Sequence, residues 1–160
     1  MPRQPRNLLP DRIFHVTARA VADEPLFVDD HDRKRFLWLL NRFCSEYGIR
    51  RLAYCLMGTH YHLLLEGTSA DLSRLMHQLN SRYAQRFNER HGRHGHLFGE
   101  RYTVRVVQDE EQLSDTYAYI DANPRQAGLC GWDERWPWAG PTFRPPRDQS
   151  VGTDPCGGSP

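Results

Sequence analysis

Lysine is almost absent from this sequence of 160 residues, which contains twenty arginines but only one lysine, Lys34. Arginine forms bidentate contacts with phosphate, so the bias suits a phosphate-rich partner, although a biased genomic base composition would produce the same skew. Cysteine is scarce too, and its four residues lie far apart without the spacing of a metal-binding pair. This favours free thiols in a reducing compartment over disulfides or a zinc site.

Long hydrophobic runs are also missing. No stretch approaches the length of a membrane span, and the N-terminal segment 1–6 has no apolar core behind it, so neither a membrane protein nor a secretory signal is expected. The length suits one domain that buries a core without disulfides or a structural metal. We predict an extended basic arm over residues 1–10, one domain over 11–143 and a disordered Pro/Gly-rich tail over 144–160.

Charge is segregated along the chain. Residues 72–108 contain seven arginines against two acidic residues, whereas residues 109–123 contain five acidic residues and no basic one. A basic block of this kind is typical of a protein that binds a phosphate-rich partner.

Hydrophobic periodicity predicts an α+β chain. Strands are expected at about 12–20, 49–57, 60–66 and 102–108, and helices at about 31–47, 70–91 and from 109 onward. The first six elements have the order of a ferredoxin-like fold, a four-stranded antiparallel sheet with two helices on one face and the other face open to a ligand. The additional C-terminal helix is predicted to be capped by Asp109 and stopped by Pro124.

The strand 60–66 begins with two histidines one residue apart. Because side chains alternate across a strand, His60 and His62 share one face, while Tyr61, Leu63 and Leu65 share the other. One face therefore meets the core, and the other presents two imidazoles. Neutral imidazole is the commonest side-chain metal ligand, so the pair could form half of a metal site.

The last helix carries two tyrosines with different environments. Leu113, Tyr117 and Ile120 form its core stripe, and Tyr119 points about 160° away from Tyr117. Tyr119 shares a polar face with Asn123, one turn later. Tyrosine can act as a covalent nucleophile, and a metal held by imidazoles can polarise a phosphoryl oxygen, so together these residues indicate phosphodiester transesterification.

Several motifs, taken at their joint spacing, resemble those of the REP-associated tyrosine transposases, which belong to the single-tyrosine HUH transposase superfamily. The resemblance extends from about Phe14 to Trp138 and rests on the following segments: His60-Tyr61-His62-Leu63-Leu64-Leu65, Tyr83–Asn88, His91-Gly92-Arg93, Gly95–Phe98, Arg101-Tyr102, and Tyr119–Pro124 followed by Ala127-Gly128-Leu129.

The resemblance implies that residues 11–143 form an HUH transposase domain, a metal-dependent endonuclease and strand transferase for single-stranded DNA. By position, His60 and His62 would bind Mg²⁺ or Mn²⁺, and Asn123 would complete the metal shell. Tyr119 would attack the scissile phosphate, leaving a 5′-phosphotyrosine and a free 3′-hydroxyl. Tyr61 departs from the bulky apolar residue usual between the histidines.

The implied partner is single-stranded or hairpin DNA in the bacterial cytoplasm, at the nucleoid and without a membrane. The residues predicted to contact DNA are Arg82, Arg86, Arg93, His94, His96 and Arg101. The chain could act as a monomer or a homodimer, with its active site built in cis or in trans. Two alternatives stay open: a retired transposase that only binds hairpin DNA or RNA, and a phosphohydrolase that uses water as its nucleophile.

Overall fold

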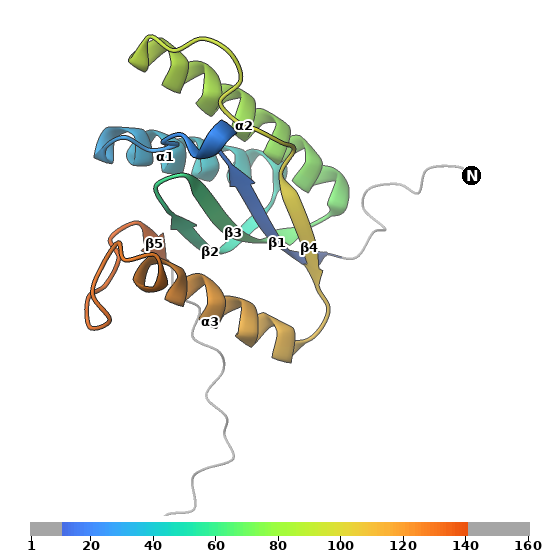
Figure 1. Ribbon diagram of the computed structural model, residues 1–160. Coiled ribbons are helices and arrows are strands. Elements are labelled where there is room, and N and C mark those ends of the chain that lie inside the picture. Colours follow the sequence, from blue (N-terminus) through green and yellow to red (C-terminus); the bar gives the residue numbers. More distant parts are fainter. Residues whose placement is uncertain (1–10, 141–160) are drawn as a thin grey trace, which may run out of the picture.

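The computed structural model describes residues 11–140, which form one antiparallel sheet with helices on both faces (Figure 1). The strand order is β4-β1-β3-β2-β5. The elements are β1 (Arg12–Arg19), the 3₁₀ helix η2 (Val21–Asp23), α1 (Asp30–Tyr47), β2 (Arg50–Leu56), β3 (His60–Gly67), α2 (Ser69–His91), β4 (Thr103–Val107), α3 (Glu110–Gln126) and β5 (Ala139–Gly140).

The first four strands and two helices confirm the predicted ferredoxin-like arrangement, and the short β5 adds one strand beside β2. The predicted arm 1–10 and tail 144–160 lie outside the described residues, as do positions 141–143 of the predicted domain. Within the described part of the chain, no helix has both the length and the apolar character needed to cross a bilayer.

The two helices on the first face, α1 and α2, begin at residues with capping side chains and end at glycines. The Asp29 side chain caps α1, and the Thr68 side chain caps α2. Both helices end at glycines in the left-handed region, Gly48 with φ of 65° and Gly92 with φ of 61°. Glycine adopts this conformation without steric cost, so the chain can turn sharply back to the sheet.

The main core lies between the sheet and the layer formed by α1 and α2 (Figure 1). Tyr61, Leu63 and Leu65 of β3 point into it, which confirms the predicted alternation along this strand. The Tyr61 hydroxyl donates a hydrogen bond to Oδ1 of Asn80 in α2. A tyrosine is therefore accommodated between the two histidines because its one polar atom has a buried partner.

The prediction that the second face of the sheet is open to a ligand is correct only in part: α3 covers one part of this face and leaves the rest uncovered (Figure 1). Ile120 of α3 is buried in a smaller cluster with residues of β2, β3 and their connection, namely Ala53, Cys55, Met57 and Leu64. Leu113 and Tyr117 pack against the same cluster, which confirms the predicted core stripe of this helix. An amphipathic helix packs its apolar stripe against another element, and α3 packs its stripe against this face of the sheet.

The prediction that Pro124 stops α3 is also wrong. The helix continues to Gln126, and Pro124 is buried inside it. Proline fixes φ near the helical value, so the backbone continues in helical conformation through Pro124 with the loss of one hydrogen-bond donor. The final turn is closed by the Ala127 amide, which donates to the Asn123 carbonyl at 2.9 Å.

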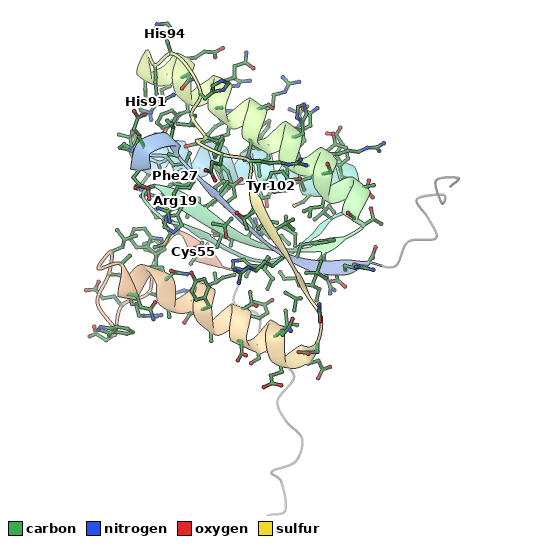
Figure 2. The ribbon with its side chains drawn as sticks, turned by 45° about the vertical axis from the view of Figure 1, so that its right-hand side comes forward. Arg19, Phe27, Cys55, His91, His94 and Tyr102 are labelled. Carbon is green, nitrogen blue, oxygen red and sulfur yellow. The ribbon has the colours of Figure 1, made fainter. Side chains whose placement is uncertain are left out.

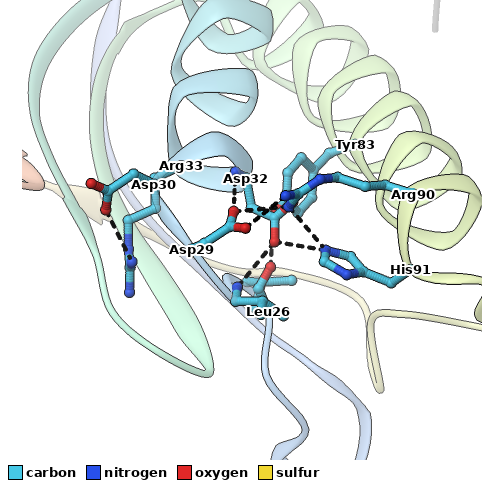
Figure 3. Close-up of polar contacts among 9 residues, drawn as sticks. Leu26, Asp29, Asp30, Asp32, Arg33, Tyr83, Arg90 and His91 are labelled. Atoms are coloured by element: carbon cyan, nitrogen blue, oxygen red, sulfur yellow. Dashed lines mark hydrogen bonds and ion pairs between the residues drawn. The ribbon is translucent and has the colours of Figure 1, made fainter.

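A polar network joins the start of α1 to the end of α2 (Figure 3). Asp32 is only 3% exposed, and its carboxylate accepts hydrogen bonds from Arg90 at 2.8 Å and from the Val28 amide at 3.0 Å. His91 Nε2 lies 2.9 Å from the same carboxylate. Arg90 also donates to Asp29, the residue that caps α1.

We expect Asp32→Ala to lower the free energy of unfolding by about 2–3 kcal/mol, because it leaves partly buried Arg90 and His91 without their shared acceptor. The expected loss of free energy is smaller than for a fully buried ion pair because the Arg90 side chain is 35% exposed. Urea unfolding measures it. Asp30→Ala is the matched control: Asp30 is exposed and lies 3.9 Å from Arg33, so a comparable loss there would contradict the prediction.

Candidate active site

A cleft of about 1260 Å³ lies between α3 and the part of the sheet that α3 leaves uncovered. Both predicted histidines, the predicted tyrosine and the predicted asparagine line it. Among the lining side chains are eight polar groups from four elements: His15, Thr17 and Arg19 of β1, His60 and His62 of β3, Arg105 of β4, and Tyr119 and Asn123 of α3.

The two histidines of β3 point into the cleft with their rings 5.1 Å apart. The Nδ1 atom of His60 lies 3.1 Å from the Thr59 hydroxyl. The Nδ1 atom of His62 lies 3.1 Å from His15 Nε2 and 3.2 Å from the Thr17 hydroxyl. In both rings, therefore, Nδ1 is the nitrogen engaged by a protein neighbour.

The Nε2 atom of His62 is buried and has no hydrogen-bond partner among the described residues. Buried polar atoms in proteins are nearly always paired, so an unpaired one facing a cleft indicates a place for a ligand. Burial lowers the pKa of His62 to about 3, and His15, His60 and Arg19 act in the same direction. Burial likewise lowers the pKa of His60. Both imidazoles are therefore neutral at pH 7, the form that binds metals.

Tyr119 faces the histidines across the cleft. Its ring centroid lies 5.7 Å from that of His62 and 6.1 Å from that of His15, both edge-on. The residue is 52% exposed, so it is accessible to a bound strand. Asn123, one turn later, donates through Nδ2 to the Tyr119 carbonyl at 3.1 Å. A single chain thus brings the tyrosine and the histidines together.

The donor set for a metal is incomplete if only the usual residue types are considered. Across residues 11–140, no three His, Cys, Asp or Glu side chains gather in a way that could hold a metal ion. Glu66, which shares the His62 face of β3, is paired with Arg50 instead. His60 and His62 fit a metal as two imidazole donors, and any third protein ligand would have to be of another type, such as the Asn123 amide.

The residues predicted to contact DNA are not in the cleft. Arg82 and Arg86 lie on α2, in the layer on the opposite face of the sheet. Figure 2 shows His94 beyond the end of α2, on the side of the molecule away from α3, and His96 follows in the same loop. Arg101 lines a neighbouring hollow beside β1. Their contacts with DNA stay predictions.

Arg93 has a structural role of its own. Its guanidinium donates to the Glu24 carboxylate at 2.7 Å and to the His96 carbonyl at 2.9 Å. It also reaches Asn88 and the carbonyl of Gly95. These contacts hold the loop after α2 against the segment before α1. Only the exposed 20% of the Arg93 side chain is available for a contact with DNA.

The residues of the cleft that the sequence did not single out as site residues include His15, Thr17, Arg19 and Arg105. His15, Thr17 and Arg19 alternate with buried residues along β1, so the sequence pattern indicates that they share one face of the strand. The missing information was the strand register, in which Thr17 pairs with His62 and Arg19 with His60. Arg105 pairs with His15 from the other side. Strand β1 therefore lies between the histidine pair of β3 and Arg105 of β4.

The fold is similar to that of two solved structures described as transposases. A structure described as a REP-associated tyrosine transposase bound to a REP hairpin superimposes with a TM-score of 0.64 at 12% identity, covering 87% of this chain and 82% of that one. A candidate transposase from Deinococcus radiodurans R1 gives a TM-score of 0.51 at 19% identity, covering 74% of this chain and 95% of that one. At these identities the likeness concerns the fold. No curated protein matches the chain.

The sequence itself defines the family. The model of the family described as "Transposase IS200 like" matches residues 11–123, which include the histidine pair, Tyr119 and Asn123. The chain belongs to this family of transposases.

Proposed function

We propose that this transposase is a metal-dependent endonuclease and strand transferase for single-stranded DNA, with Tyr119 as its nucleophile. The observation that carries the proposal is the position of the Tyr119 ring, 5.7 Å from His62 across a cleft formed by one chain. A tyrosine on a polar helix face beside neutral, partly unpaired imidazoles suits attack on a phosphodiester held between them.

His60 and His62 would hold Mg²⁺ or Mn²⁺ through their Nε2 atoms, with the Asn123 side-chain oxygen as a third ligand. The bound metal would polarise the scissile phosphate and offset the charge that develops on it. Histidine suits Mn²⁺ better than Mg²⁺, so we expect Mn²⁺ to be the better cofactor in vitro.

Tyr119 performs the covalent step. Its oxygen forms a bond to phosphorus, the bond from phosphorus to the 3′-oxygen breaks, the tyrosine loses its proton and the leaving 3′-oxygen gains one. The products are a 5′-phosphotyrosine and a free 3′-hydroxyl. Because one phosphodiester replaces another, a second 3′-hydroxyl can reverse the step and join new ends without a nucleotide cofactor.

The proposed substrate is single-stranded or hairpin DNA. The neighbour with a TM-score of 0.64 was solved with a REP hairpin, and its fold is the fold of this chain. Arg105 places positive charge in the cleft itself, where a phosphate backbone would run, and Arg19, which is ion-paired with Asp23 at 3.1 Å, lines the same cleft. The six residues predicted to contact DNA lie outside the cleft, so they would meet the parts of the substrate that are not being cut. With such a substrate, the activity would be exerted at the bacterial nucleoid.

We expect Arg105→Ala to weaken binding of hairpin DNA roughly tenfold at moderate salt and to reduce the slope of log K against log salt by about one, because one phosphate contact is lost. Fluorescence anisotropy over a salt series measures both quantities. Arg42→Ala, which removes an exposed arginine from α1 on the opposite face of the sheet, is the control and should leave binding nearly unchanged. Equal losses in the two variants would mean that Arg105 contributes only general charge.

The test of the proposed function is a covalent adduct of defined polarity. The full chain is incubated with a hairpin oligonucleotide and Mn²⁺ and then resolved under denaturing conditions. A label on the DNA 3′ end should migrate with the protein, whereas a label on the 5′ end should stay with a shortened free strand. Binding that persists in EDTA, with no cleavage of any REP-like hairpin in Mn²⁺, would instead support a retired transposase. Turnover without an adduct would support a phosphohydrolase.

A further inference from the structure

His15 lies beside the histidine pair, on the neighbouring strand β1. Its ring meets that of His62 edge to edge, with centroids 5.3 Å apart and planes 28° apart. Its Nε2 atom is 3.1 Å from His62 Nδ1, and the Thr17 hydroxyl is 3.2 Å from the same nitrogen. Both residues belong to β1, whose register with β3 places Thr17 directly opposite His62.

These contacts constrain the proton on His62. A neutral imidazole has one N–H and one lone pair, and the position of the proton depends on what its two nitrogens meet. Nδ1 meets two potential acceptors in His15 and Thr17, whereas Nε2 is buried without a partner in the described residues. A proton on Nδ1 is therefore stabilised by a hydrogen bond, and a proton on Nε2 would be buried unpaired.

We propose that His15 and Thr17 are positioning residues that fix His62 with its proton on Nδ1, so that the Nε2 lone pair faces the cleft. The inference rests on the proposed function, because the lone pair is what a metal would use. Hydrogen bonds of this kind orient a metal-binding histidine and raise its basicity. For His15 to accept from His62, its own proton must be on Nδ1, so the two rings are locked together.

His60 is supported differently, by the hydroxyl of its neighbour Thr59 at 3.1 Å. Its partner is adjacent in sequence, whereas the partners of His62 come from another strand. The orientation of His62 thus depends on correct pairing of β1 with β3. Loss of His15 should affect His62 and leave His60 in place.

The first measurement is the tautomer of His62 in the metal-free, full-length protein, from long-range ¹H–¹⁵N correlation spectra. We expect the proton on Nδ1 in the wild type and a shift toward Nε2 in the His15→Ala/Thr17→Val double variant. A wild-type His62 with its proton on Nε2, or a double variant with an unchanged tautomer, would overturn the inference. Neither result depends on whether the protein binds metal.

The second measurement is Mn²⁺ affinity without DNA, by calorimetry or from the spectrum of free Mn²⁺. We expect the double variant to bind Mn²⁺ roughly 10–100-fold more weakly. His15→Gln should keep most of the affinity, because its side-chain oxygen can replace Nε2 as the acceptor. His77→Gln, an exposed histidine on α2, is the matched control.

The outcomes are distinguishable. If the wild type binds no Mn²⁺, the metal in the proposed function is contradicted, while the tautomer still decides whether His15 and Thr17 fix the ring. If the wild type binds Mn²⁺ and the double variant binds it equally well, the inference fails and the proposed function stands. The urea midpoint of each variant separates loss of the fold from loss of positioning, and the His15→Gln protein tests the same point with a smaller perturbation.

Discussion

Replacing Tyr119 with phenylalanine is expected to abolish the covalent adduct and to lower strand cleavage by at least roughly a thousandfold, because it removes the nucleophile itself. The phenyl ring can keep its position beside His62 and His15, since those contacts involve ring atoms. The fold and the affinity for hairpin DNA should therefore survive. Denaturing electrophoresis of 3′-labelled DNA measures the adduct, and anisotropy measures the binding.

Tyr117→Phe is the matched control, two residues earlier on the same helix. Tyr117 packs against the cluster under α3, and its hydroxyl donates to the Leu52 carbonyl at 3.4 Å. Removing that hydroxyl should lower the free energy of unfolding by about 1 kcal/mol or less and leave the adduct intact. An adduct that persists in Tyr119→Phe, or disappears only in Tyr117→Phe, would refute the assignment of the nucleophile.

The second large effect is expected at the histidines. His62→Ala and His60→Ala should each lower cleavage in Mn²⁺ roughly a hundredfold or more, because each would remove one of the two imidazoles proposed to hold the metal that offsets charge on the reacting phosphate. The diagnostic quantity is the stimulation by metal, the ratio of rates in Mn²⁺ and in EDTA. It should be large for the wild type and close to one for the variants.

Hairpin binding in EDTA provides the reference for this experiment, because the positive charge of Arg19 and Arg105 remains in both variants. His77→Gln, which changes an exposed histidine on α2, should retain full stimulation by metal. If His62→Ala is stimulated by Mn²⁺ as strongly as the wild type, the histidine pair does not hold the catalytic metal.

The parts of the structure predicted correctly from the sequence are those fixed by local pattern. Alternation along β3 placed His60 and His62 on one face and Tyr61 on the other. Helical spacing separated Tyr119 from the core stripe of α3, and Asp109 caps that helix as predicted, accepting from the Gln112 amide at 2.8 Å. Each of these depends on residues within one or two turns of each other.

The parts that were missed depend on contacts between distant segments. The partnership of His15 with His62 is a matter of strand register, which the alternation of β1 by itself cannot define. The part of the sheet face covered by α3 was predicted to be open because nothing in the helix sequence states which surface its apolar stripe meets. Pro124 is a local exception: the restriction before proline predicts a helix end there, but α3 continues through it to Gln126.

The attachment of α3 has a consequence for how this transposase tolerates change. The proposed metal ligands His60 and His62 belong to β3, which is paired on both sides, by β1 and β2. The proposed nucleophile, Tyr119, belongs to a helix that buries only Ile120 and Pro124, whereas α2 buries six residues. Opening of α3 therefore requires less free energy than opening of the sheet. Substitutions beneath α3 will erode catalysis while the domain still folds, so inactive descendants of this protein should commonly remain well-folded DNA-binding proteins.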